Sequence, residues 1–143
     1  VLFRLAGRAP SDRIERMIGI LLITHGALGE ALIQCACHVM NRRPLQLMQL
    51  GMAGQDDPLD ALPLARRLLE ITDTGDGVLI LTDILGATPA NTAAKLLEPG
   101  RIEGVAGVNL PMLLRVITYR ERSMDVLVKK AVAGACEGVA HMK

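Results

Sequence analysis

The feature that most constrains this chain is a short apolar run that ends in a histidine and a glycine. Residues 17–23 are apolar, Thr24, His25 and Gly26 follow, and a helical pattern begins at Ala27 or Leu28. The run is much shorter than the ~20 apolar residues that span a membrane. Because it is rich in Ile and Leu and ends in a glycine turn, it predicts a strand buried on both faces, as in parallel sheets. His25 would then lie in the crevice where open α/β sheets bind ligands.

The rest of the chain alternates between strand and helix patterns. Strands are predicted over residues 45–50, 78–82 and 102–108, and helices over residues 28–40, 58–71, 88–97, 112–119 and a last segment capped by Ser123. Asp57-Pro58 and Thr88-Pro89 each place an N-cap residue before a proline, which is a common helix start. Pro63 either kinks the second helix or marks its true beginning, because an interior proline loses a hydrogen bond.

The element order βαβαβαβαα predicts the fold class. We expect an α/β fold with three αβα layers and a mostly parallel sheet of strand order 2-1-3-4. Residues 139–143 are a candidate for an antiparallel edge strand, since Val139 and Met142 are apolar where a frayed end would be polar. Residues 1–16 show no clear period, so we interpret them as an extension before a single domain of residues 17–143.

Composition narrows the classes of function. A net charge of +1 gives no electrostatic case for binding nucleic acid or an anionic membrane. One Phe, one Tyr and no Trp leave no platform on which bases or a flavin ring could stack. The three cysteines and the lack of a secretory signal predict a cytoplasmic protein without a disulfide framework. Cys35, Cys37 and His38 do not form a convincing metal site, because positions 35 and 37 face different sides of a helix. We therefore expect neither a metal nor a cofactor.

Polar residues follow neighbouring strands of the predicted sheet. In the strand order 2-1-3-4, the loops that carry His25 and Asp83 lie side by side, so the two side chains can meet. An aspartate bonded to one ring nitrogen fixes the histidine tautomer and leaves the other nitrogen as a nucleophile. Thr88 opens a helix, and its hydroxyl and the unpaired N–H groups beside it suit a phosphoryl group. Each residue alone has an ordinary structural explanation, but together they predict a phosphohistidine site.

Three motifs at these positions resemble the IIA domain of the mannose-family sugar phosphotransferase system. They are Ile20-Leu-Leu-Ile-Thr-His-Gly26, Thr82-Asp-Ile-Leu-Gly-Ala-Thr-Pro-Ala-Asn91 and Gly107-Val-Asn-Leu-Pro-Met112, and the likeness runs from residue 17 to about residue 142. The resemblance implies that His25 accepts a phosphoryl group from the phosphocarrier protein HPr and passes it to a IIB partner. It also implies that Asp83 orients His25 and that Thr88 contacts the phosphate, in a site that includes Gly26, Gly86 and Ala87. Ala87 departs from the glycine that the family often has there.

The resemblance leaves more than one function open. The first is a phosphotransferase component in sugar uptake, with the IIB partner on a separate chain. The second is a regulatory phosphocarrier whose phosphorylation state is read by a partner protein without sugar transport. A more distant relative is the phosphoryl-donor subunit of dihydroxyacetone kinase, and a nucleotide- or flavin-binding module is an alternative of another class. The resemblance further implies a homodimer in which residues 139–143 cross to the partner's sheet.

Overall fold

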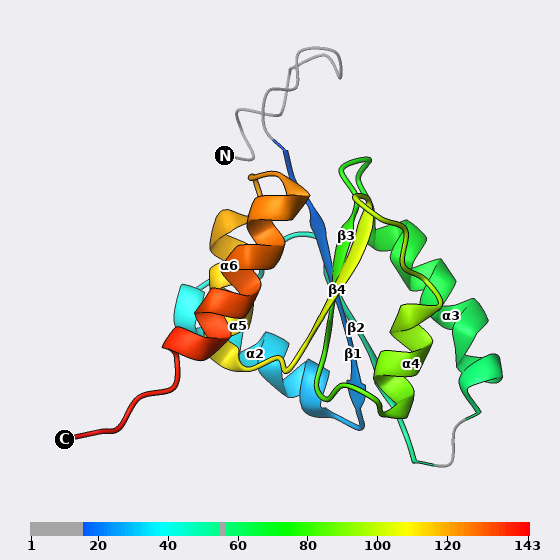
Figure 1. Cartoon of the computed structure of the whole chain (residues 1–143), viewed down its shortest axis with the longest axis horizontal. Helices are drawn as coiled ribbons and strands as arrows, with labels where there is room; N and C mark the ends of the chain where they lie inside the picture. The colour runs from blue at the N-terminus through cyan, green and yellow to red at the C-terminus, as the bar shows by residue number, and fades with distance from the viewer. Residues whose placement is uncertain (1–15, 55–56) are drawn as a thin grey trace.

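Four strands form one parallel sheet at the centre of the molecule (Figure 1). The computed structural model describes residues 16–54 and 57–143, so the extension expected over residues 1–16 lies, except for Arg16, outside the described residues. The strands are β1 (Gly19–His25), β2 (Leu47–Met52), β3 (Val78–Thr82) and β4 (Ile102–Ala106). Their order is β2-β1-β3-β4 and all three pairings are parallel, which confirms the predicted strand order.

Helices cover both faces of the sheet, as the three-layer prediction requires (Figure 1). One face carries α2 (Leu28–Met40), α5 (Leu110–Tyr119) and α6 (Met124–Glu137), and the other carries α3 (Pro58–Thr72) and α4 (Thr88–Ala94). A separate cluster of buried aliphatic side chains fills each interface between helices and sheet. Among the helices that the structure describes, none has the length and apolar character needed to cross a membrane.

The start of β2 differs from the prediction, which placed this strand over residues 45–50. Gln46 has a positive φ of 48°, which a strand residue does not adopt. The guanidinium of Arg120 donates hydrogen bonds to the carbonyl oxygens of Leu45 and Gln46 and thereby holds them in a turn. The strand therefore begins only at Leu47.

The ends of two other elements also differ from the prediction. α4 ends at Ala94 rather than at residue 97, because residues 95–97 continue as tighter turns with backbone bonds three residues back. β4 ends at Ala106 rather than at residue 108, because Gly107 adopts a φ of 91°. The backbone N–H groups of Gly107 and Val108 both donate to Thr82, which closes the loop after β4 onto the end of β3.

Capping side chains fix the starts of three helices. Asp57 accepts a hydrogen bond from Leu59 at the start of α3, so this helix begins at Pro58 and continues through Pro63. Asn109 and Ser123 cap α5 and α6 in the same way. The exception is α4, where Ala87 is the N-cap and Thr88 is the first helical residue rather than the predicted cap.

The C-terminal residues 139–143 extend away from the body of the molecule after α6 (Figure 1). They form no strand within this single chain, and Val139 and Met142 are 77% and 89% exposed. β4 lies at the edge of the sheet, next to β3 only. The antiparallel edge strand is thus not made within one chain, and its exchange between two chains stays a prediction.

Candidate functional site

His25 is the last residue of β1, at the carboxyl edge of the sheet. Its ring Nδ1 lies 2.8 Å from Oδ2 of Asp83, and its backbone N–H donates to the same oxygen at 3.0 Å. The His25 side chain is 48% exposed, whereas that of Asp83 is only 12% exposed. The predicted meeting of the two side chains is confirmed, and one carboxylate oxygen holds both the backbone and the ring of the histidine.

Hydrogen bonds keep the Asp83 carboxylate ionised. Burial works to raise the pKa of Asp83, but the hydrogen bonds that its carboxylate accepts from the backbone and ring of His25 outweigh burial, so the pKa lies below its usual value. An ionised carboxylate can only accept hydrogen bonds, so Nδ1 of His25 carries the proton and donates. The lone pair is then left on Nε2 of an exposed ring, which is the arrangement a nucleophile needs.

The residues expected around the phosphate lie on the two loops at this edge. Gly26 and Gly86 adopt left-handed backbone conformations, with φ of 52° and 87°, and space is open beside both. Ala87 and Thr88 are half-buried at the start of α4, and the Thr88 hydroxyl makes no hydrogen bond within the described residues. α4 has only seven residues, which limits the helix dipole at its start.

The remaining histidines and cysteines form no second site. His38 and Cys35 are exposed on α2, while Cys37 packs against the buried cluster beneath that helix. His141 is exposed in the C-terminal tail. Across residues 16–54 and 57–143, no group of three His, Cys, Asp or Glu side chains is placed to hold a metal ion.

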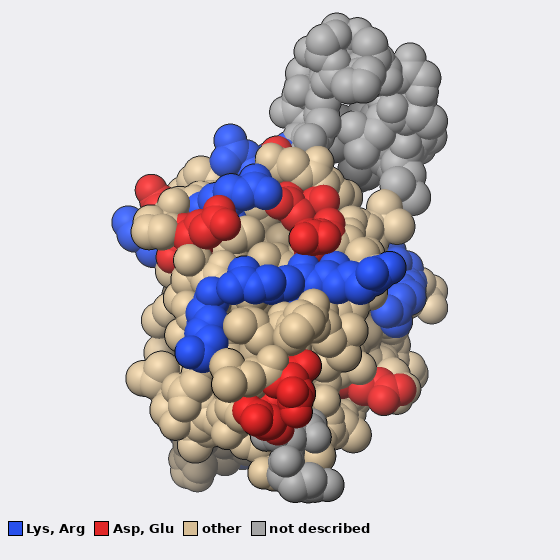
Figure 2. Space-filling model, turned by 90° about the vertical axis from the view of Figure 1, so that its right-hand side faces the viewer, with Lys and Arg blue, Asp and Glu red and all other residues tan. Residues whose placement is uncertain are grey.

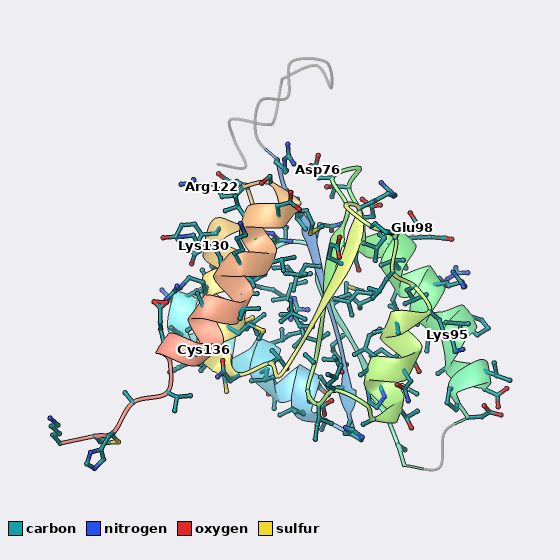
Figure 3. The ribbon with its side chains drawn as sticks, in the orientation of Figure 1. Asp76, Lys95, Glu98, Arg122, Lys130 and Cys136 are labelled. Carbon is teal, nitrogen blue, oxygen red and sulfur yellow. The ribbon has the colours of Figure 1, made fainter. Side chains whose placement is uncertain are left out.

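The face covered by α3 and α4 carries charges of both signs. Figure 2 shows a band of Lys and Arg side chains across this face, with acidic side chains on both sides of it. A cavity of about 180 Å³ opens there between α3 and the start of β4. Its Arg101 is already paired with Asp73 and Glu98. The cavity lies at the amino ends of the strands, the end of the sheet where Figure 3 labels Asp76, and so opposite His25.

Sequence reasoning missed two supports of the histidine. Thr24 is fully buried, and its Oγ1 accepts a hydrogen bond from the backbone N–H of Gly29 at 2.9 Å. Gly51 belongs to β2 and lies opposite Thr24, although the prediction placed it in a loop. The bond between Thr24 and Gly29 could have been found from the sequence, because the two residues are five positions apart across a predicted turn. Nothing in the sequence distinguishes Gly51 from a loop glycine.

A model of the EIIA-man family, described as the fructose IIA component of the phosphotransferase system, matches residues 19–132. The chain belongs to this family. The match spans every strand and includes all three motifs, which confirms the resemblance inferred from them.

Individual components of phosphotransferase systems are also similar to this chain. The mannose-specific EIIAB component of Escherichia coli (strain K12) is 30% identical over 129 residues, which are 88% of this chain and 40% of that protein. The chain thus spans about two fifths of the length of this relative. The fructose-specific EIIA component of Bacillus subtilis (strain 168) is 53% identical over 45 residues, 31% of each chain.

A solved structure shows the same fold. The mannose/sorbose-specific IIA subunit of the phosphotransferase system from Enterococcus faecalis has a TM-score of 0.79 at 19% identity, over 89% of this chain and 96% of that chain.

Proposed function

We propose that this chain is a phosphoryl carrier of a sugar phosphotransferase system. His25 accepts a phosphoryl group from HPr and passes it to a IIB partner. The observation that carries the proposal is the ring of His25, held at Nδ1 by the ionised Asp83 carboxylate while the rest of the side chain is half exposed. Membership of the EIIA-man family supports the same class of reaction.

The transfer needs one nucleophilic atom and one negative charge that stabilises the positive charge of the phosphorylated ring. The Nε2 lone pair attacks phosphorus on phosphorylated HPr, and the bond between phosphorus and the HPr atom breaks as the N–P bond forms. The leaving group departs with the electron pair of the broken bond. The ring of His25 gains positive charge, which the Asp83 carboxylate stabilises. In the second step, a nucleophile of the IIB partner attacks the same phosphorus and the N–P electron pair returns to the ring.

The phosphoryl oxygens are placed between His25 and the loop of residues 84–88. Thr88 supplies a hydroxyl donor, and the backbone N–H groups of residues 85–88 supply others, because that of Ile84 already donates to Asp83. Gly26 and Gly86 leave open space on the two sides of this position. Ala87 adds only a methyl group where the family often has glycine.

Protein partners suit the surface around the site. Ile84 and Leu85 directly follow Asp83 and are 57% and 83% exposed, so they offer an apolar contact to a docking protein. The proposal includes HPr on one side of the transfer and a IIB protein on the other. It also includes a homodimer and a cytoplasmic location. The free cysteines support the location.

The test is phosphorylation from phosphoenolpyruvate through HPr and its upstream kinase. The wild-type chain should gain one acid-labile phosphate, and His25→Ala should gain none while its circular dichroism spectrum is unchanged. His38→Ala is the matched control, because His38 is exposed on α2 and should leave labelling intact. Full labelling of His25→Ala would contradict the assignment of His25 as the phosphoryl acceptor. Release of the phosphate to a IIB protein separates a sugar-uptake carrier from a regulatory phosphocarrier.

A further inference from the structure

The turn that carries His25 is tied down on both sides of the histidine. On one side the backbone N–H of His25 donates to Asp83, as described above. On the other side the N–H of Gly26 donates to the carbonyl of Met52 in β2 at 2.9 Å. The chain then enters α2, where the N–H of Gly29 is bonded to the hydroxyl of Thr24. The backbone before and after His25 is thus connected to both neighbouring strands.

Gly51 is what lets the turn approach β2 so closely. It pairs with Thr24 in the register of β1 and β2. A Cβ added at Gly51 would lie 2.1 Å from the carbonyl oxygen of Gly26. Real atoms do not approach to that distance, so a side chain at Gly51 must displace either the Gly26 peptide or the edge strand β2. Either movement disturbs the bond from Gly26 to Met52 and moves the backbone that bears His25.

Thr24 stabilises the same turn from the buried side. Its side chain is fully buried, and its hydroxyl satisfies a backbone N–H in the first turn of α2 that would otherwise lack an intrahelical partner. A Cβ added at Gly29 would lie 2.9 Å from this hydroxyl and 3.4 Å from Gln49, so the helix start is packed directly against the strands. The hydrogen bond from Gly29 to Thr24 therefore holds the first turn of α2 close to the end of β1.

We propose that Thr24 and Gly51 are positioning residues for His25. They fix the turn so that Nδ1 stays on Asp83 and Nε2 faces outward. A displacement of about 1 Å in a reacting group can cost about 100-fold in rate. The geometric part of the inference stands on the structure alone, and only its kinetic consequence rests on the proposed phosphoryl transfer.

The test compares Gly51→Ala with Gly19→Ala. A Cβ at Gly19 would lie 2.3 Å from the carbonyl oxygen of Thr72, a similar clash, but at the amino end of β1 and far from His25. Both variants should lose stability in urea unfolding, while only Gly51→Ala should slow single-turnover transfer from HPr, by about 10- to 100-fold. Nitrogen-15 spectra of the His25 ring should show the Nδ1–H tautomer in wild type and Gly19→Ala, and its partial loss in Gly51→Ala.

Variants of Thr24 decide the question if Gly51→Ala does not fold. Thr24→Val removes the hydroxyl at constant shape and should reproduce the loss of rate and of the tautomer signal, whereas Thr24→Ser should restore both. Wild-type rates and tautomer in a folded Gly51→Ala or in Thr24→Val would overturn the inference, as would equal slowing in Gly19→Ala. If wild type accepts no phosphate from HPr but the tautomer still shifts in these variants, the proposed function fails and the positioning role stands.

Discussion

At the scale of single residues, one oxygen atom of Asp83 connects the loop after β3 to the end of β1. It receives both the backbone N–H and the ring of His25, so the carboxylate fixes the strand end and the side chain together. The pKa of Asp83 lies below its usual value because these bonds outweigh the effect of burial. The negative charge is therefore in place before the positive charge that the proposed transfer would put on the His25 ring.

Replacing Asp83 by asparagine should preserve the fold and slow phosphoryl transfer. The amide keeps the shape of the side chain but lacks the negative charge that orients and stabilises an imidazolium-like ring. We expect single-turnover transfer from HPr to fall by about 10- to 10⁴-fold, by analogy with other His–Asp pairs. Asp60→Asn is the control, because Asp60 is exposed on α3. An unchanged rate in Asp83→Asn would remove the orienting role.

The sequence was enough to place His25 beside Asp83. Each residue follows a buried apolar run that ends in a threonine, and a parallel sheet brings the ends of adjacent strands together. The role of Gly51 could not be predicted in this way. It depends on a close approach between β2 and the turn after β1, which is a property of the packed backbone and not of any local pattern.

At the scale of elements, Arg120 joins α5 to the amino ends of two strands. Its buried guanidinium donates hydrogen bonds to the carbonyl oxygens of Ile18, Leu45 and Gln46. Burial, followed by the charge of Arg42, lowers the pKa of Arg120 to about 10, while Glu121 works in the opposite direction. The group is thus still protonated at neutral pH.

The contacts of Arg120 also explain why the start of β2 was predicted wrongly. Arg120 lies 75 positions from Leu45 and 74 from Gln46 in the chain, so no local pattern contains these contacts. The apolar alternation over residues 45–50 fits a strand, but tertiary contacts hold its first two residues in a turn. The starts of α3 and α6 were easier to predict, because Asp57 and Ser123 cap residues only two or three positions away. α5 begins at Leu110 rather than at the predicted residue 112, because Asn109 caps it.

Replacing Arg120 by methionine should destabilise the fold strongly. Methionine keeps the apolar stem but removes the guanidinium donor from three carbonyl oxygens, of which that of Gln46 has a second donor in the N–H of Ile20. We expect the free energy of unfolding to fall by about 3–5 kcal/mol, measured by urea unfolding. Arg67→Met, at an exposed position of α3, should change it by less than about 0.5 kcal/mol. A loss below about 1 kcal/mol in Arg120→Met would mean that other donors replace the guanidinium.

At the scale of the whole molecule, the outer edge of β4 has no neighbouring strand within the described part of one chain, and the C-terminal tail has no strand to pair with there. Beyond a bridge between Ile102 and Glu98, β4 pairs with β3 only, so the rest of its outer edge presents backbone groups to solvent. The tail of residues 139–143 leaves α6 with exposed apolar side chains (Figure 1). If two copies exchanged their tails, the tail of each copy would cover the β4 edge of the other, and the result would be a closed two-fold dimer. This is the homodimer that the sequence resemblance implies.

Deleting residues 139–143 should therefore shift the protein from dimer towards monomer, or cause it to aggregate. The physical reason is that the exposed edge of β4 loses the strand that we expect to cover it. Multi-angle light scattering of the full and truncated chains measures the change directly. His141→Ala is the matched control, because it keeps the length and the apolar residues of the tail and should leave the mass unchanged. A truncated chain that remains a stable dimer would show that the tail does not hold the subunits together, and a monomeric full-length chain would remove the homodimer from the proposal.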